Sequence, residues 1–182
     1  NCYLVSTDQV QKKLMERGVD KSKILITGIP IHPNFWERHR KEDIRLQFHL
    51  KDMPTVLVMG GGWGFMKDEA VNALLASYRE QIQVIFCLGS NEKSLEKMQK
   101  DPRFIHPNIH LLGFTKEIDK LMEVSDLLIT KPGGMTCSEG LAKGIPMLFH
   151  QPLPGQEEEN SHYFAQQGWG TPMISLDDIT DW

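Results

Sequence analysis

Residues 126–150 read DLLITKPGGMTCSEGLAKGIPMLFH, with an apolar run at each end and a helical pattern between them. The first run ends abruptly in the letters KPGG, and the second begins directly after Gly144-Ile-Pro. Apolar residues recur three to four positions apart over 135–144, which is typical of a helix, and Gly144 is a suitable residue to end it. The stretch therefore predicts a strand, a tight turn, a helix and a second strand.

The same alternation extends over most of the chain. Strands that are apolar throughout are buried on both faces, so their alternation with helical patterns predicts a parallel sheet covered by helices on both sides. The fold class is therefore α/β. The predicted strands are 2–6, 23–27, 55–59, 83–88, 109–113, 126–130, 146–150 and 171–175, and the helical patterns cover 8–18, 67–80, 91–100, 116–125, 135–144 and 157–168.

The segment 28–54 interrupts this rhythm. Pro30 and Pro33 are followed by a charged helical stretch and then by Pro54, directly before a new strand. This predicts three parts: the end of one α/β unit (1–28), a hinge with a linker helix (29–53) and a second unit (54–182). The chain has no initiator Met, begins as a strand and stops where a helix starts, so we expect it to be a piece of a longer protein.

Composition excludes several classes of protein. The net charge is −4 and no stretch concentrates lysine and arginine, which argues against binding to nucleic acid. No apolar run approaches the roughly 18 residues that a membrane-spanning helix needs, so the chain is not expected to cross a bilayer by itself. Its 3 cysteines are odd in number and widely spaced, which favours reduced thiols and a cytoplasmic location.

Ligands of open parallel sheets bind at the C-terminal ends of the strands. Glycine is frequent in the loops that leave those ends, so that a ligand can approach the backbone closely. The loop Gly60–Gly64 does not match the dinucleotide fingerprint G-x-G-x-x-G, because Phe65 stands in the place of the third glycine. A turn without a ligand is an equal alternative for this loop. No D-x-D motif occurs, and Pro107 separates His106 from His110, so no metal site is predicted.

The segment Gly133–Glu139 has the features of an anion site. Backbone N–H groups at a helix start, with the helix dipole behind them, bind a phosphate without a metal ion. Glu139 is expected within the first turn or so, where it could simply be a charge that the dipole favours. Alternatively, its carboxylate could accept hydrogen bonds from two neighbouring hydroxyl groups, such as those of a ribose.

The segment Gly155–Asn160 opens another helix with acidic and amide side chains. An ordinary acidic first turn would explain them, because carboxylates are favourable at a helix N-terminus. However, the preceding letters PLPGQ form a stiff loop that fixes the direction of Gln156 and Glu157. Amides and carboxylates in such a loop are suited to bind the hydroxyl groups of a sugar.

Three segments, GGGWG, LLGFTKEIDKLMEVSDLLITKPGGMTCSEGLAKGIPML and PLPGQEEENSHY, together resemble the C-terminal half of glycosyltransferase family 28. The chain looks most similar to the processive diacylglycerol glucosyltransferases and monogalactosyldiacylglycerol synthases, and more distantly to MurG. The resemblance covers nearly the whole chain. It implies a Rossmann-like domain that binds a UDP-sugar donor and forms one half of the two-domain architecture called GT-B.

The resemblance also implies which residues contact each part of the donor. From base to sugar, they are Phe114 and Thr115 at the uracil; Glu139 at the ribose; Gly133, Gly134, Met135 and Thr136 at the diphosphate; Gly61 and Gly62 facing the cleft and the phosphates; and Gly155, Gln156 and Glu157 at the sugar and distal phosphate, with Asn160 supporting that last loop.

The implied reaction is inverting transfer of a hexose from a UDP-hexose to diacylglycerol, without a cofactor or a metal ion. In the family the general base and the lipid-binding surface belong to the N-terminal domain, so no catalytic residue is predicted here and the chain alone is expected to be inactive. The full protein would bind peripherally to the inner face of the cell membrane. Glucose and galactose both remain open as the donor sugar. The alternatives are a UDP-sugar 2-epimerase and a non-catalytic donor-binding subunit that needs a partner chain.

Overall fold

The computed structural model describes residues 1–60 and 69–181. The chain divides into two compact units, Asn1–His32 (unit 1) and Pro33–Trp182 (unit 2). No helix in the described ranges is long and apolar enough to cross a bilayer.

Unit 1 is small and has few buried side chains. Strand β1 (Tyr3–Val5) pairs in parallel with β2 (Ile24–Ile26), and α1 (Asp8–Glu16) and the short η1 (Lys21–Lys23) lie between them in sequence. The Thr7 hydroxyl caps α1 by accepting a hydrogen bond from the Val10 N–H at 3.3 Å. Only Val5 and Ile24 are buried among its apolar residues.

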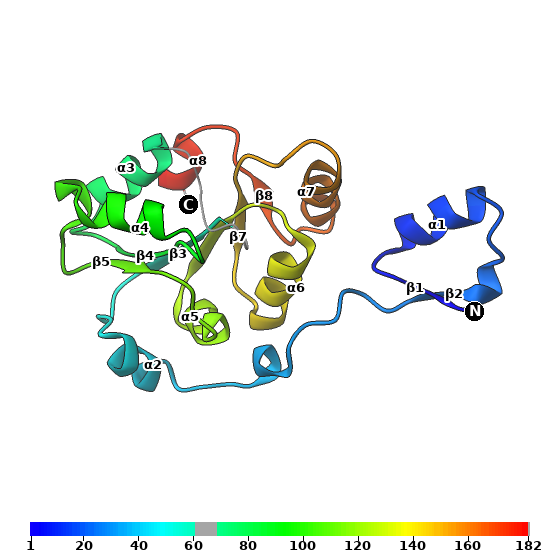
Figure 1. Cartoon of the computed structure of the whole chain (residues 1–182), viewed down its shortest axis with the longest axis horizontal. Coiled ribbons are helices and arrows are strands. Elements are labelled where there is room, and N and C mark those ends of the chain that lie inside the picture. Colours follow the sequence, from blue (N-terminus) through cyan, green and yellow to red (C-terminus); the bar gives the residue numbers. More distant parts are fainter. Residues whose placement is uncertain (61–68, 182) are drawn as a thin grey trace. The chain divides into compact units, whose positions relative to one another are not determined.

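Unit 2 contains a six-stranded parallel sheet, which confirms the predicted Rossmann-like α/β class (Figure 1). Each predicted strand is present and differs from the prediction only at its ends. The strands are β3 (Thr55–Met59), β4 (Gln83–Cys87), β5 (Ile109–Leu112), β6 (Leu127–Thr130), β7 (Met147–Phe149) and β8 (Thr171–Pro172). The helices are η2 (Pro33–Trp36), α2 (Lys41–Phe48), α3 (Glu69–Ser77), α4 (Glu92–Gln99), η3 (Pro102–Phe104), α5 (Ile118–Val124), α6 (Gly134–Lys143), α7 (Gln156–Gln166) and α8 (Asp177–Thr180).

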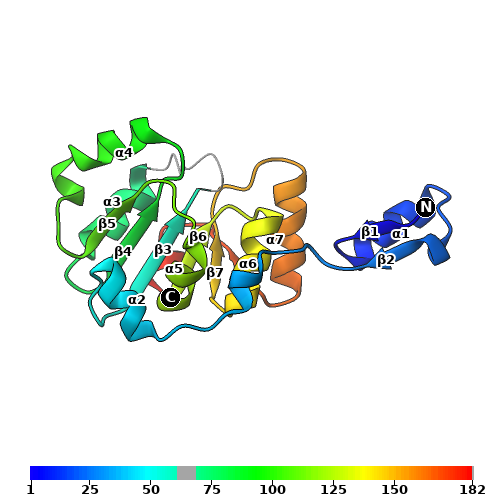
Figure 2. The same ribbon diagram turned by 60° about the horizontal axis from the view of Figure 1, so that its bottom comes forward.

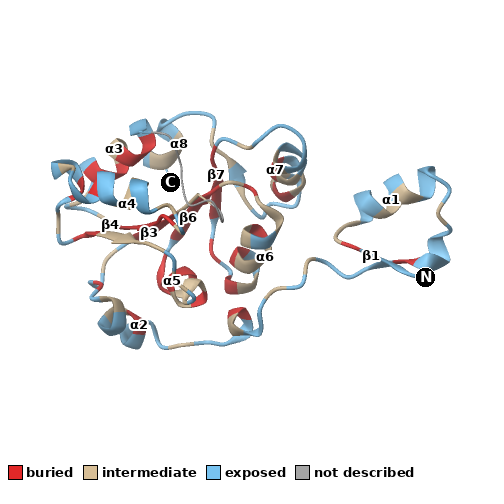
Figure 3. Ribbon diagram, in the orientation of Figure 1, coloured by how far each residue is buried: buried red, intermediate tan, exposed pale blue. Residues whose placement is uncertain are grey.

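Successive side chains of a strand point to opposite faces of the sheet, so both faces of these apolar strands are buried. Val58 of β3 packs in one cluster with Leu75 of α3, on the face that α3, α4 and α8 cover. On the opposite face lie α5 and α6, and Phe149 of β7 contacts Phe164 of α7 with ring centroids 6.0 Å apart. The central strands β3, β4, β6 and β7 are accordingly the most deeply buried elements (Figure 3).

The strand order is β5-β4-β3-β6-β7-β8, so the chain fills one half of the sheet outward from β3 and then returns to start the other half at β6. Helices that follow β3 and β6 therefore cover opposite faces, and the loops leaving these two neighbouring strands diverge. A crevice at such a switch point is the usual ligand site of an open parallel sheet. The KPGG turn after β6 lies at this point.

Candidate donor site

The KPGG turn ends β6 and begins α6 within three residues. The Gly133 N–H donates to the Lys131 carbonyl at 2.7 Å, and the first helical bond runs from the Cys137 N–H to the Gly133 carbonyl at 2.9 Å. Gly133 is the N-cap and, as a glycine, has no side chain with which to cap the helix. The N–H groups of the first three helical residues, Gly134, Met135 and Thr136, have no acceptor inside the helix.

Two other helices, α1 and α4, start differently. Thr7 caps α1 and Asn91 caps α4, each with a side-chain oxygen that accepts a backbone N–H. At α6 the N-cap glycine has no such oxygen, and its lack of a side chain leaves the backbone open. Free N–H groups with the positive end of the helix dipole behind them are suited to bind an anion such as a diphosphate.

Glu139 is the sixth residue of α6 and therefore lies in its second turn. The first turn of α6 contains no acidic residue, so the prediction that Glu139 falls within the first turn or so was wrong. Because the influence of the dipole falls off within the first turn, a simple dipole charge is a weaker explanation for this residue. Burial raises the pKa of Glu139 to about 7. A partly desolvated carboxylate gains strongly from hydroxyl donors, which is consistent with a role in binding ribose.

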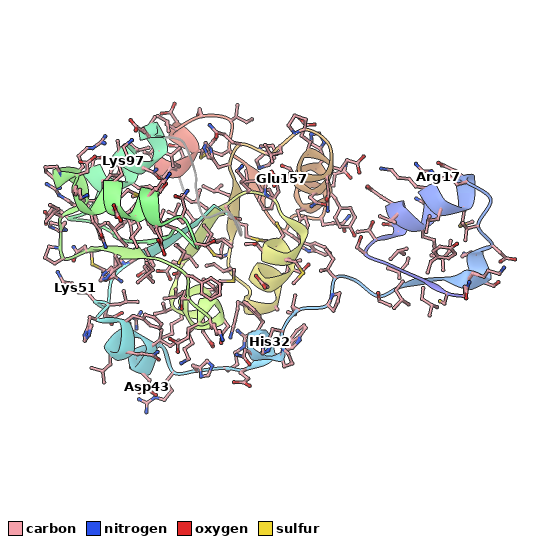
Figure 4. The ribbon with its side chains drawn as sticks, in the orientation of Figure 1. Arg17, His32, Asp43, Lys51, Lys97 and Glu157 are labelled. Atoms are coloured by element: carbon pink, nitrogen blue, oxygen red, sulfur yellow. The ribbon has the colours of Figure 1, made fainter. Side chains whose placement is uncertain are left out.

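The loop between β7 and α7 is held by carboxylates of the helix that follows it. Glu157 Oε2 accepts the Leu153 N–H at 2.7 Å, and Glu158 Oε2 accepts the Gly155 N–H at 3.2 Å. Figure 4 labels Glu157 at the start of α7. Gln156 is exposed, so its amide is accessible. Glu157 was expected to approach the sugar, and one of its carboxylate oxygens is engaged within the loop.

Asn160 connects the two loops. Its side-chain amide donates to the Pro132 carbonyl at 2.9 Å, which lies in the KPGG turn and not in its own loop as expected. This hydrogen bond ties the KPGG turn to α7. Residues 130–134 and the start of α7 are therefore neighbours at the C-terminal edge of the sheet.

Phe114 and Thr115 follow β5. Phe114 has 73% of its surface exposed, which is unusual for a phenylalanine. The Thr115 hydroxyl accepts the Glu117 N–H at 3.1 Å and so fixes the turn into α5. An exposed ring on a fixed turn is suited to stack on a planar base. Gly61 and Gly62 lie outside the described residues.

Gln151, two residues after the end of β7, is not among the site residues expected from the sequence. It has a φ of 44°, in the left-handed region that non-glycine residues rarely adopt. Such a conformation at the edge of a candidate site can be part of how the site is built, since the surroundings must enforce it. The sequence does not indicate this conformation, because glutamine has no preference for the left-handed region.

Comparisons with known proteins identify the family of the chain. Residues 55–179 match the glycosyltransferase family 28 C-terminal domain. A processive diacylglycerol beta-glucosyltransferase of Staphylococcus epidermidis is 39% identical over 98% of this chain and 47% of its own length. The chain spans about half the length of the curated relatives it matches.

Solved structures share the fold at low identity. The UDP-GlcNAc 2-epimerase of Neisseria meningitidis, bound to UDP-GlcNAc, has a TM-score of 0.72 at 16% identity and covers 99% of this chain and 50% of its own. MurG of Acinetobacter baumannii has a TM-score of 0.58 at 16% identity and covers 87% of this chain and 47% of its own. The fold is therefore that of one half of a GT-B protein. The match over more than half of the chain shows that it belongs to glycosyltransferase family 28, of which it contains the C-terminal domain.

Proposed function

We propose that this chain is the donor-binding half of an inverting hexosyltransferase that transfers a hexose from a UDP-hexose to diacylglycerol. The observation that carries the proposal is the uncapped start of α6 at the switch point of the sheet, in a chain of family 28. The diphosphate would bind at the N–H groups of residues 134–136. Glu139, half-buried one turn further on, would bind the ribose hydroxyls.

The remaining donor contacts follow from the loops around α6. Phe114 and the backbone of Thr115 would bracket the uracil, and Gly155, Gln156 and Glu157 would approach the sugar. Asn160 would hold the diphosphate turn through the carbonyl of Pro132. Gly61 and Gly62, which precede α3, would complete the phosphate side of the cleft.

The chemistry proposed for this site is stabilisation of the leaving group. As the bond between the sugar C1 and the phosphate oxygen breaks, negative charge develops on UDP, and preorganised N–H donors lower the barrier for that step. The acceptor hydroxyl must lose a proton to a general base. We place that base, and the lipid-binding surface, in the other half of the enzyme, so that this chain alone would bind the donor and transfer little or no sugar.

The name of the Staphylococcus relative supports glucose as the sugar and diacylglycerol as the acceptor. A β-glucoside made from UDP-glucose, in which C1 carries an α-linked phosphate, requires inversion at C1. Galactose is the alternative donor sugar. Because diacylglycerol resides in a membrane, the full enzyme would work as a peripheral protein on the cytoplasmic face.

In this proposal residues 1–28 are the last part of the acceptor domain, residues 54–182 bind the donor, and residues 29–53 lie between them in sequence. The division of the chain after His32 supports two separate domains.

Calorimetric titration of the chain with UDP, UDP-glucose, UDP-galactose and UDP-GlcNAc, each with and without EDTA, tests the proposal. We expect UDP to bind equally well in EDTA, and the sugar that adds affinity identifies the donor. Glu139→Ala should weaken UDP binding at least tenfold, whereas Glu16→Ala in unit 1 should leave it unchanged.

Absence of UDP binding to both this chain and the full-length protein would contradict the proposal. Release of free N-acetylmannosamine from UDP-GlcNAc by the full-length protein, without transfer to a lipid, would instead identify a 2-epimerase.

A further inference from the structure

Residues 33–50, here called the strap, begin unit 2 and lead to β3. Three apolar side chains anchor it: Phe35 of η2, Ile44 of α2 and Leu50 have exposed fractions of 7%, 2% and 9%. Figures 1 and 2 show η2 beside α6 and α2 beside α5. The strap is therefore packed on the two helices that begin at the proposed donor site.

Two buried carboxylates on α5 face the strap. Asp119 and Glu123 lie one turn apart, and their side chains are only 5% and 8% exposed. Burying a carboxylate without a partner is strongly unfavourable. Lys143, at the end of α6, supplies one partner, because its fully buried Nζ lies 2.8 Å from Glu123 Oε2.

The strap supplies the other partners. Arg38 Nη1 lies 4.0 Å from Glu123 Oε1, and His39 Nε2 lies 3.8 Å from Asp119 Oδ2, an ion pair when the imidazole is protonated. The Glu37 carbonyl accepts a hydrogen bond from Lys143 Nζ at 2.6 Å. Lifting the strap would leave Glu123 and Lys143 without part of their compensation.

Arg38 also completes the C-terminus of α6. Its guanidinium donates to the carbonyls of Ala142 and Lys143, each at 3.3 Å. The last four carbonyls of a helix lack partners inside it, and a cation beside them is favourable. Arg38 therefore fixes the end of the helix whose beginning is the proposed diphosphate site.

Residues 28–31, shortly before the strap, are held less firmly than the strap itself. The N–H groups of Gly28, Ile29 and Ile31 donate to no described residue, and Pro30 has no N–H to donate. Gly28 has a φ of +73°, and the boundary between the two units follows His32.

We propose that the strap is a fixed part of the donor half and that the joint between the two halves is confined to Gly28–His32. The joint is thus much shorter than the 29–53 hinge suggested by the sequence. Motion of one half relative to the other would leave α5 and α6, and with them the donor site, undistorted. Only this last consequence rests on the proposed function.

Amide hydrogen exchange of the whole chain at pH 7 tests the proposal without a ligand. We expect the amides of α2 to exchange roughly 100-fold more slowly than those of Gly28–His32. An isolated helix of 8 residues is not stable in water, so protection of α2 reports docking of the strap. Exchange of α2 as fast as Gly28–His32, or protection of Gly28–His32 equal to that of α2, would overturn the proposal.

A pair of neighbouring variants tests the anchor. Arg38→Gln should speed exchange in α2 at least tenfold and leave β3 and β6 unchanged. Arg40→Gln is the matched control, because among the described residues Arg40 forms an ion pair only with the exposed Glu42 of the strap itself, at 3.8 Å. Equal effects of the two variants would show that the charge cluster does not hold the strap. If UDP does not bind at all, the proposed function fails and the exchange result still decides where the joint lies.

Discussion

Glu139 links the chemistry of the donor site to pH. Burial raises its pKa to about 7 in the free chain, whereas hydrogen bonds from ribose hydroxyls favour the ionised form and would lower this pKa in the complex. UDP binding should then release a proton from chains in which Glu139 is protonated. Affinity therefore falls as pH drops below 7, and we expect UDP to bind about tenfold more weakly at pH 6 than at pH 8.

The variant Glu139→Gln isolates this effect. The terminal phosphate of UDP itself titrates near pH 6, so part of any pH dependence belongs to the ligand. Titrations of both proteins at pH 6, 7 and 8 separate the two contributions, because the glutamine variant retains only the part from UDP. Identical pH profiles for the two proteins would show that the Glu139 carboxylate does not bind the ligand.

Asn160 provides a second test at the level of one side chain. Asn160→Ala removes the hydrogen bond to the Pro132 carbonyl, which should destabilise the chain by about 1 kcal/mol and weaken UDP binding several-fold, because the diphosphate turn loses its support. Gln166→Ala, an exposed amide on the same helix, is the control for both measurements. A loss of stability without any loss of UDP affinity would mean that the hydrogen bond does not position the site.

Residues differ in how far their structural roles can be predicted from the sequence. The tight turn of the KPGG glycines into α6 could be predicted, because the turn is local in sequence. The partner of Asn160 could not be predicted, since Pro132 lies 28 residues away and either loop could have been supported. The positive φ of Gln151 likewise arises from its surroundings.

At the scale of elements, close contact between backbone and a buried ring sets the position of β8. A Cβ added to Gly170 would lie 2.6 Å from Cε2 of Phe149, a fully buried ring that also packs on Phe164. Gly170→Ala must therefore displace this ring and should destabilise the chain by about 1–3 kcal/mol. Urea denaturation followed by circular dichroism measures the change.

Gly113 is the matched control for Gly170. A Cβ at Gly113 would lie 3.6 Å from Cδ2 of Leu95, an ordinary contact, so Gly113→Ala should change stability by less than about 1 kcal/mol. Equal urea midpoints for Gly170→Ala and Gly113→Ala would show that the Phe149 ring adjusts without strain.

Most strands and helices could be predicted from the sequence, whereas the packing of α2 on its neighbours could not. Continuous apolar runs identify the strands of unit 2 because both faces of the sheet are buried. The charged stretch of α2 was recognised as helical, yet its place on α5 depends on groups far apart in sequence. Arg38 donates hydrogen bonds to the carbonyls of Ala142 and Lys143, which lie 104 and 105 positions away in the sequence. No periodic pattern in the sequence indicates such a contact.

At the scale of the whole molecule, the two units differ greatly in what they can contribute to stability. Unit 1 pairs only three residues of β1 with three of β2 and buries two apolar side chains, which is too little for independent stability. Unit 2 contains the six-stranded sheet with helices on both faces. Stability and donor binding should therefore both belong to unit 2.

Removal of residues 1–27 tests this division. We expect the melting temperature of the shortened chain to lie within about 2 °C of that of the parent. In a chain of this size, a change of about 0.5 kcal/mol or less in the free energy of unfolding shifts the melting temperature by no more than that. UDP at 100 times its dissociation constant should add about 2.7 kcal/mol to either protein. That gain raises both midpoints by roughly 5–10 °C, whether or not EDTA is present. Differential scanning calorimetry measures these shifts. A large loss of stability on removing residues 1–27, or a UDP-induced shift that disappears with them, would show that unit 1 is part of the folded donor site.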